Sequence, residues 1–474
     1  MTSRIAPARR VAFDLLLELR QNPQLHSDDL LRSGGVSALS SADRNLATAL
    51  VMGVLRWEIA LDQRIAALLT KAKSHLPEPV ELAVELGALQ LLLLDRIPAH
   101  AAIFESVEIA KESGNPHAAG MVNAVLRKLA GSPKLATTPA RNTSANEIAR
   151  AWAHPNWMVE RWVKEYGLAA AGAICRYDQY PPRVTVRLVA PGAEEALLSE
   201  GIELEPATFV CQARRVVKGD VSATLAFAQG MVRIQDEASQ LVAEVAAHRL
   251  AESRTAEKRG PEPGTSNVRL GILDCCAAPG GKTAILAERN PNLPILACDV
   301  SSGRLKAMKN FLRRQKATDH ITYRAVDATE LTYDREFAAV LCDAPCSGTG
   351  TLARNPEIRH RLAVEDLRRQ QARQARLLSA AMRALAIGGR LVYSTCSLEP
   401  EENEIVIRQA LESTKGFRLL SWREQMQALE ADGGLHRGSI DLLQAPSSGE
   451  KFLRTMPGTH PMDGFFAAVL TRET

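Results

Sequence analysis

Apolar residues recur at spacings of three and four positions from Ile5 to about Leu129, which predicts helices through this part of the chain. We expect these helices to be interrupted at Gly34-Gly35, at Pro77–Pro79, at Pro98 and at Gly114-Asn115-Pro116. The clearest apolar stripes are Ala12, Leu15, Leu16 and Leu19; Leu46, Leu50, Val54 and Leu55; and Leu82, Leu86, Leu89 and Leu93. The pattern predicts an all-α domain of five or more helices over residues 1–135.

The composition then changes twice. Residues 131–146 are rich in Ser, Thr, Pro and Asn, which is typical of a linker. Residues 148–235 predict a small α+β subdomain, with a helix over 157–165 and short strands over 183–188, 208–211, 224–227 and 231–234. A polar insert over 252–267 has the low hydrophobicity of a loop.

Strand and helix patterns alternate from residue 236 to the end of the chain. Strands are expected over 270–274, 295–299, 337–343 and 390–394, with a shorter one near Tyr323, and helices from Lys282, from Arg304, over 364–385 and from Glu401. This alternation predicts a doubly wound, Rossmann-like α/β domain with a parallel sheet over 236–474. The strand ends at Asp274, Asp299, Asp343 and Thr395 would share the carboxyl edge, where such sheets bind ligands.

Composition narrows the classes of protein that remain. No apolar run reaches the roughly 18 residues of a membrane span, and the first 20 residues lack a signal core, so we expect a cytoplasmic protein without a membrane partner. The net charge of +4 permits nucleic acid as a partner without requiring it. Eight cysteines without a CxxC pair argue against a disulfide framework and a zinc site, and we expect no metal.

The segment 274–283, DCCAAPGGKT, ends a strand with a Pro-Gly-Gly turn and opens a helix, which indicates a ligand-binding loop. A phosphate-binding loop would need glycine at position 276, where Cys276 stands, and a plain tight turn is the other alternative. Asp299, 25 residues after Asp274, is placed to accept the hydroxyl groups of a ribose. Asp327 follows the next strand and is a candidate contact for an adenine amino group. Together these strand ends predict an adenosine site.

Two cysteine motifs follow strands of the same predicted sheet. Cys346 lies in DAPCSGTG, after Asp343, and Cys396 lies in STCSLEP, 50 residues further on. We therefore expect two thiols near each other and near Asp343 on one rim of the cleft. A single cysteine is more often a small buried apolar residue, and this alternative stays open for each of them.

These motifs, with GTHP at 458–461, resemble those of S-adenosylmethionine-dependent RNA cytosine-5 methyltransferases. The helical N-terminal part, with LSSADR at 39–44 and VNAVLRK at 122–128, resembles the NusB-like domain of the RsmB (Sun, Fmu) subgroup. The resemblance implies methylation of carbon 5 of a cytosine in 16S, small-subunit ribosomal RNA by a monomer, with the NusB-like domain acting in RNA or protein recognition.

The resemblance also implies roles for individual residues. Cys396 would be the nucleophile that adds to carbon 6 of the base, and Cys346 would assist its release. Asp343 would stabilise a protonated cytosine N3, and Lys282 would position groups or lower a thiol pKa. The implied contacts of the S-adenosyl-L-methionine cofactor are Cys276, Ala277, Ala278, Pro279, Gly280, Gly281, Lys282, Asp299, Asp327 and Asp343.

Two alternative functions stay open at this point. One is a transfer RNA cytosine-5 methyltransferase, and the other is a non-catalytic RNA-binding assembly or antitermination factor. Two basic runs are candidates for phosphate contact: residues 304–324 hold seven basic residues against one acidic residue, and residues 354–376 hold seven arginines against three acidic residues.

Overall fold

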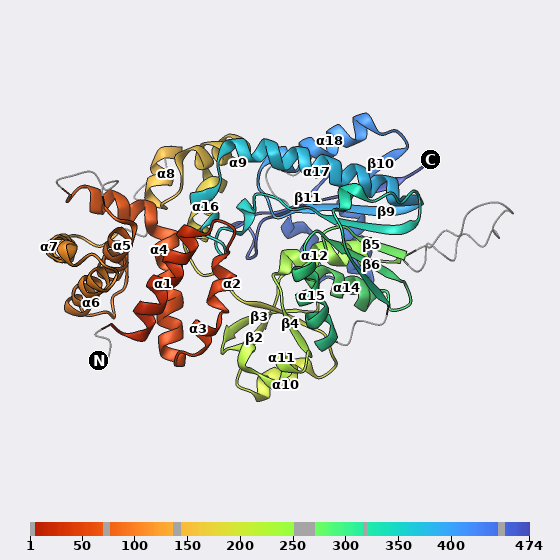
Figure 1. Cartoon of the computed structure of the whole chain (residues 1–474). Coiled ribbons are helices and arrows are strands. Elements are labelled where there is room, and N and C mark those ends of the chain that lie inside the picture. Colours follow the sequence, from red (N-terminus) through yellow and green to blue (C-terminus); the bar gives the residue numbers. More distant parts are fainter. Residues whose placement is uncertain (1–4, 70–75, 136–143, 251–270, 316–319, 444–450) are drawn as a thin grey trace. The chain divides into compact units, whose positions relative to one another are not determined.

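The computed structural model describes residues 5–69, 76–135, 144–250, 271–315, 320–443 and 451–474. The chain forms two compact units, one of residues 1–181 with 352–361 and the other of residues 182–351 with 362–474 (Figure 1). The predicted loop over 252–267 and residues 136–143 of the predicted linker over 131–146 lie outside the described residues. In the described part of the chain, no helix is long and apolar enough to cross a membrane.

The first unit is all-α, as the apolar spacing predicts. Its apolar α5 is buried along most of its length and packs against α4, α6 and α7. One expectation was wrong: Gly34-Gly35 opens the short helix α3 instead of ending one, since the N–H groups of Val36 and Ser37 bond back to Ser33 O. The helices are α1 (Pro7–Gln21), α2 (Ser27–Leu31), α3 (Gly34–Ser37), α4 (Ser41–Ala66), α5 (Glu78–Leu93), α6 (Ala99–Glu112), α7 (Ala119–Ala130), α8 (Ala145–Ala151) and α9 (Asn156–Asp178).

A short stretch from the distant part of the sequence completes this unit. Residues 352–361, which include α16 (Ile358–Arg361), bond to the loops and helix ends of the first unit. The Glu357 carboxylate, 2% exposed, accepts from Ser27 N at 3.1 Å and from Ser27 Oγ at 2.8 Å. Arg361 donates to the carbonyls of Leu19, Pro23 and Leu25 over 2.6 to 3.0 Å.

The second unit begins with a small antiparallel sheet in the order β2-β3-β1-β4. Its strands are β1 (Thr185–Leu188), β2 (Glu203–Pro206), β3 (Ala213–Lys218) and β4 (Val232–Ile234), with the short helices α10 (Ala193–Ser199) and α11 (Leu225–Ala228). The strands expected over 183–188 and 231–234 are confirmed. The strand expected over 224–227 is wrong, because the Thr224 side chain caps α11 by accepting from Phe227 N.

The strand expected over 208–211 is also wrong. The N–H groups of Thr208, Phe209 and Val210 all donate to the buried Glu237 carboxylate, so they are not available to a strand ladder. Glu237 opens α12 (Glu237–Ala247), the helix that leads into the large sheet. The short apolar run at 209–211 was therefore not enough to make a strand here, because a carboxylate 27 to 29 positions later accepts from the amide groups.

The large sheet has the order β10-β12-β9-β8-β5-β6-β7, and β11 pairs with β12 outside this path. Strands β9, β8, β5, β6 and β7 are parallel, whereas β12 pairs antiparallel with β9 and β10. The Rossmann-like prediction is confirmed for the parallel part, but the sheet is mixed. The strands are β5 (Gly271–Asp274), β6 (Ile295–Asp299), β7 (Ile321–Ala325), β8 (Phe337–Asp343), β9 (Leu385–Thr395), β10 (Phe417–Leu420), β11 (Leu453–Thr455) and β12 (Phe465–Arg472).

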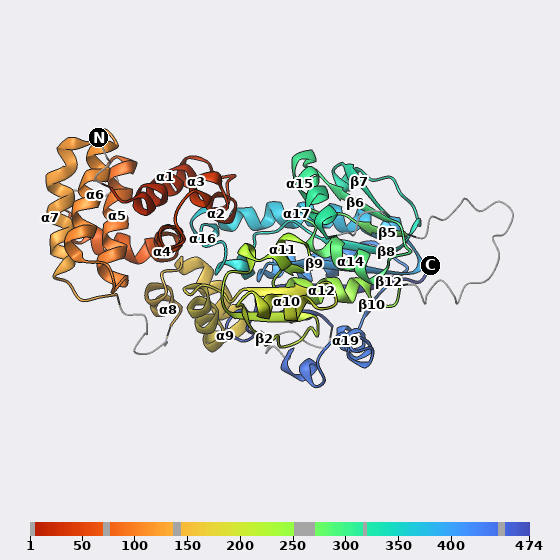
Figure 2. The same cartoon turned by 90° about the horizontal axis from the view of Figure 1, so that it is seen from below.

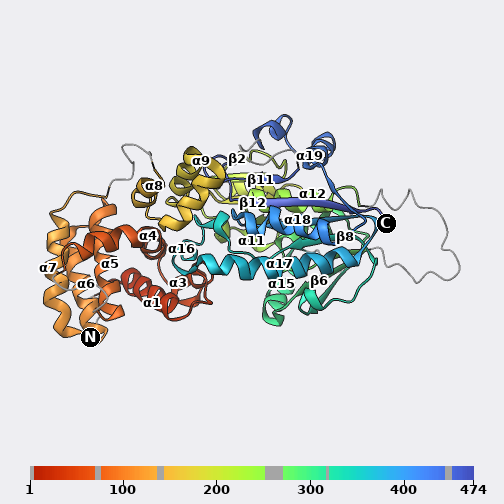
Figure 3. The ribbon, with the colours of Figure 1, turned by 90° about the horizontal axis from the view of Figure 1, so that it is seen from above.

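Helices cover both faces of this sheet (Figures 2 and 3). Neighbouring strand residues pack into two different apolar cores. Ile272 and Leu341 pack in one apolar core with α12, α14 (Gly281–Arg289) and α15 (Ser302–Arg314). Leu273 and Cys342 pack in the other with α17 (Val364–Ala384) and α18 (Glu404–Ser413). A further helix, α19 (Trp422–Ala431), packs against α12.

Candidate active site

The loop between β5 and α14 forms the turn that the sequence predicts. Gly280 has a φ of 105°, and a Cβ atom there would lie 2.7 Å from Cγ of Met308, so the position requires glycine. The N–H of Ala277 donates to Cys298 O over 2.8 Å and ties the turn to β6. The first amide groups of α14 have no acceptor within the helix, as is usual where a helix start meets a ligand.

Asp274 lies buried at the start of this turn. Its side chain is 1% exposed, Oδ2 accepts from Thr283 Oγ1 over 2.7 Å, and Oδ1 has no hydrogen-bond partner. Burial raises the pKa of Asp274 to about 7, although the Thr283 hydroxyl opposes the rise, and the nearby Asp343 charge adds to it. A buried acid with an unused oxygen at a ligand loop is typical of a functional position.

Two further predicted acids follow the neighbouring strands. Asp299, 4% exposed at the end of β6, accepts from Ser301 N over 2.9 Å, and its Oδ2 lies 3.6 Å from Arg304 Nη1. Arg304 also donates to Ala278 O over 2.8 Å, so it connects Asp299 to the turn. Asp327, after β7, accepts from Thr329 N, and this bond lowers the pKa of its carboxyl. The parallel pairing of β5, β6 and β7 places all three acids along one edge of the sheet.

The two predicted thiols meet. Cys346, after β8, and Cys396, after β9, have their sulfur atoms 3.4 Å apart, and both side chains are partly exposed. The hydrogen bond with Cys396 and burial raise the pKa of Cys346 well above its usual value, and negative charge on Cys396 and Glu402 adds to the rise. Cys298 and Cys342, in contrast, are fully buried in the sheet core.

Asp343, at the end of β8, contacts both the helix that follows the β5–α14 turn and the strand that leads to Cys396. Its Oδ2 lies 2.7 Å from Lys282 Nζ, and its Oδ1 accepts from Ser394 Oγ over 2.7 Å. The Lys282 ammonium also lies over the Phe465 ring, 4.8 Å from its centre. These contacts fix the orientation of a partly exposed carboxylate at the edge of the sheet. The geometry thus brings Lys282, Asp343, Cys346 and Cys396 together.

Sequence reasoning did not identify the polar residues that hold the two thiol loops. Ser394 orients Asp343, and the buried Glu402 accepts hydrogen bonds from both Ser347 and Ser397. The only available signal was the run of acids at 399–404, and a run of acids usually indicates a solvated surface. The contact between Ser347 and Glu402, 55 positions later, is visible only in the fold.

The two basic runs differ in the structure. Along α15 the side chains of Lys306, Lys309, Arg313 and Arg314 are exposed, consistent with the predicted surface. The second run is divided, because Arg359 is 2% exposed and donates to the carbonyls of Arg56 and Ala153 within the first unit. The expectation of phosphate contact was therefore wrong for Arg359, which has a structural role.

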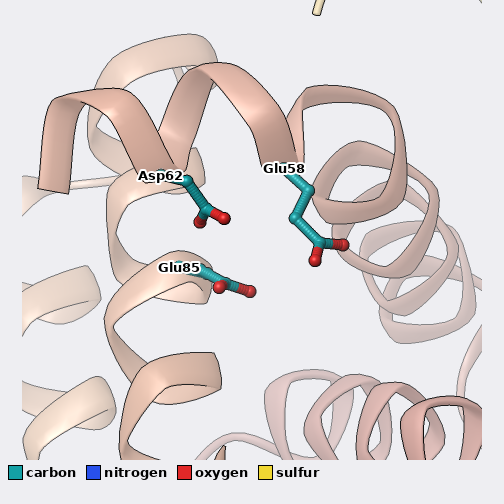
Figure 4. A group of neighbouring side chains, drawn as sticks. All are labelled: Glu58, Asp62 and Glu85. Carbon is teal, nitrogen blue, oxygen red and sulfur yellow. The ribbon is translucent and has the colours of Figure 1, made fainter. Parts of the chain in front are cut away.

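An acidic cluster in the first unit has the spacing of a metal site. Glu58 and Asp62 of α4 and Glu85 of α5 point toward one another (Figure 4). Arg20 of α1 lies 3.2 Å from Glu58 and also bonds Glu85, which is completely buried. Arg20 thus supplies one positive charge to this cluster and links α1 to α4 and α5.

Comparison with known proteins gives the family. Residues 263–471 match the model of the 16S rRNA methyltransferase RsmB/F family, and residues 6–131 match that of the NusB family. The chain is 34% identical to the probable ribosomal RNA small subunit methyltransferase B of Bacillus subtilis, over 86% of this chain and 89% of that protein. This chain belongs to the ribosomal RNA small subunit methyltransferase B family. Its relative of the same name in Xanthomonas campestris is 32% identical over 100% of this chain and 97% of that protein.

Solved structures agree with this family in fold. The crystal structure of PH0851 matches 100% of both chains with a TM-score of 0.77 at 23% identity. A methyltransferase homologue from Pyrococcus horikoshii covers 70% of this chain and 100% of its own, with a TM-score of 0.53 at 25% identity. The Rossmann-like methyltransferase fold expected for the C-terminal part is therefore confirmed, as is the NusB-like helical part.

Proposed function

We propose that this chain transfers the methyl group of S-adenosylmethionine to carbon 5 of a cytosine in 16S ribosomal RNA, through a covalent bond between Cys396 and carbon 6 of the base. The observation that carries the proposal is the thiol pair, 3.4 Å apart, in the same unit as the turn at Asp274–Gly281 and beside Asp343. The relatives named for small-subunit ribosomal RNA support the choice of RNA.

The residues at the sheet edge fit S-adenosylmethionine. Asp299 follows β6 where a ribose would present two hydroxyl donors, and Asp327 follows β7 on the side of the base. The unpartnered Oδ1 of Asp274 supplies a buried acceptor at the start of this turn. The turn residues Cys276, Ala277, Ala278, Pro279, Gly280 and Gly281 would line the contact. When bound, S-adenosylmethionine supplies the electrophilic methyl group.

Carbon 5 of cytosine needs activation before it can take a methyl group. The Cys396 thiolate forms a bond to carbon 6, and the electron pair of the 5,6 double bond then makes carbon 5 nucleophilic. Asp343 accepts a hydrogen bond from the protonated N3 of the base. Its two oxygens each accept one protein donor in this structure, which leaves lone pairs for this bond. Lys282 holds the carboxylate in the orientation this contact requires.

Release reverses the first step. After transfer, carbon 5 carries both the methyl group and a proton. Solvent water accepts that proton, its electron pair re-forms the 5,6 double bond, and the bond between carbon 6 and Cys396 sulfur breaks with its electron pair on sulfur. Cys346, whose sulfur lies 3.4 Å from that of Cys396, is placed to donate its S–H proton to the departing thiolate.

The test uses purified full-length protein, radiolabelled S-adenosylmethionine and 16S ribosomal RNA, followed by bisulfite sequencing. We expect one cytosine to be methylated by the wild-type protein and none by Cys396→Ala, whereas Cys211→Ala, which changes a thiol in the small subdomain, leaves transfer unchanged. If only transfer RNA were methylated, the substrate would be transfer RNA and not 16S ribosomal RNA. No rise in melting temperature at millimolar cofactor and no transfer to any RNA would favour an assembly factor.

A further inference from the structure

The two cysteine loops meet on one buried carboxylate. Glu402, in the turn before α18, is 0% exposed and accepts from Ser347 N over 2.8 Å. It also accepts from the hydroxyl groups of Ser347 and Ser397 and, over 3.0 Å, from Gln374 Nε2. Ser347 is the residue after Cys346, and Ser397 is the residue after Cys396. One side chain therefore joins the residues that follow both thiols.

The remaining contacts of this group leave it little freedom. Gln374 of α17 also donates to Pro345 O over 2.9 Å, on the other side of Cys346. The Tyr393 hydroxyl donates to the backbone oxygen of Glu402 over 2.7 Å, and Asn403 Nδ2 donates to Ser397 O over 2.9 Å. Gln374 of α17 thus holds the Cys346 loop, and Asn403 holds the Cys396 loop. Tyr393 of β9 holds the backbone of Glu402 between them.

We propose that Glu402 is a positioning residue for methyl transfer, whose buried carboxylate fixes the separation of the two thiols and places its charge near Cys346. The inference rests on the proposed function for its catalytic consequence. The geometry alone supports the positioning part, because a carboxylate with four donors joins two loops that also bond each other through Leu398 N and Thr349 Oγ1.

Charge supports the second part. The groups that act on the pKa of Cys346 are the Cys396 thiol, the Glu402 carboxylate and the backbone of Gly348, whose hydrogen bond opposes the rise. The hydrogen bond with Cys396 and burial raise the pKa of Cys346, and the Glu402 charge contributes in the same direction. Cys346 is placed to donate its S–H toward the Cys396 sulfur, which lies 3.4 Å away.

The first test uses thiol chemistry and needs neither RNA nor cofactor. In the full chain, Glu402→Gln keeps the side-chain size and removes the charge, Glu402→Asp keeps the charge, and Glu412→Gln changes an exposed acid on α18 as a control. Iodoacetamide labelling of Cys346 is followed against pH by mass spectrometry. We expect the pH at which Cys346 labelling is half-maximal to be about one unit lower in Glu402→Gln than in wild type. It should be unchanged in the control and close to wild type in Glu402→Asp. Equal midpoints in all four proteins would overturn the proposal.

The second test measures transfer. We expect kcat of Glu402→Gln to fall by about 100-fold, because small displacements of reacting groups have effects of this size, with KM for RNA within about threefold. If Glu402→Gln does not fold, Ser347→Ala and Ser397→Ala each remove one donor, and we expect kcat to fall about tenfold with the Cys346 midpoint unchanged. Wild-type kcat in both serine variants would contradict the positioning role. A wild-type protein that methylates no RNA would refute the proposed function, whereas the labelling midpoints would still decide the role of Glu402.

Discussion

Replacing Asp274 by Asn is expected to reverse the order of stability of the two proteins between pH 4 and pH 8. In the native structure this carboxyl group is 1% exposed and its pKa is raised to about 7 from a usual value of 3.8. A folded-state pKa above the unfolded value means that the folded state binds the proton more tightly. The Asp274 carboxyl therefore stabilises the folded state least above pH 7. Its contribution to the free energy of unfolding falls as pH rises from about 3.8 to about 7.

The magnitude follows from the size of this difference. At about 1.4 kcal/mol for each pKa unit, ionised Asp274 disfavours the folded state by about 4 kcal/mol at pH 8. Asn cannot ionise and still accepts from the Thr283 hydroxyl, but its amide group takes the place of the unpartnered Oδ1, which costs about 1 to 3 kcal/mol. The variant should therefore be more stable by about 1 to 3 kcal/mol at pH 8, and less stable by a similar amount at pH 4.

Calorimetry of both proteins without cofactor, at steps of half a pH unit from 4 to 8, measures this difference. Asp334→Asn, at an exposed position, serves as the control and should shift the melting temperature by less than about 1 °C at every pH. A difference between Asp274→Asn and wild type that does not change with pH would refute the reasoning. The reasoning would also be refuted if the melting temperature of the wild type rose relative to that of the variant as pH increased.

Three further predictions concern other parts of the chain. Gly350→Ala would place Cβ 2.3 Å from a carbonyl oxygen of a neighbouring loop, so calorimetry should show a loss of about 1 to 3 kcal/mol; an unchanged melting temperature would contradict this packing. Hydrogen bonds from His26 and from Ser27 outweigh burial and lower the pKa of Glu357, so its contribution to stability should be lost as pH falls below about 4.5, and melting of Glu357→Gln should lack this dependence. Lys306→Glu with Lys309→Glu should weaken RNA binding in filter assays and reduce its salt dependence by up to about two phosphate contacts, whereas an unchanged slope would remove α15 from the interface.

The sequence predicted the elements whose pattern is repeated and local. Strands 295–299 and 337–343 match β6 and β8 at both ends, because continuous apolar runs followed by an acid leave little choice of boundary. The shared position of Asp274, Asp299 and Asp343 at the carboxyl edge of the sheet was predicted from the parallel arrangement of the strands alone. The C-terminal strands β10, β11 and β12 were not predicted. Strand β12 pairs antiparallel with β9, and the alternation of strands and helices that indicates a parallel sheet does not indicate an antiparallel strand.

The contacts inside the site depended on information that no local pattern carries. The pairing of Cys346 with Cys396 was inferred from successive strand ends, whereas the role of Glu402 as their common acceptor was not. A buried carboxylate differs from a solvated one only in what surrounds it, and here the surroundings come from residues 28 to 55 positions away. The same holds for Arg359, whose partners Arg56 and Ala153 lie more than 200 positions earlier.

The path of the chain through residues 352–361 limits how this protein can be divided. A segment that directly follows the Cys346 loop supplies the carboxylate that accepts from Ser27 and the arginines that donate to several backbone carbonyls of the helical unit. A fragment cut at Pro181 would lack Glu357, Arg359 and Arg361 and would expose the groups they satisfy. Any hybrid that exchanges the helical unit between relatives must therefore exchange two separate stretches of sequence, and the second begins one residue after Thr351.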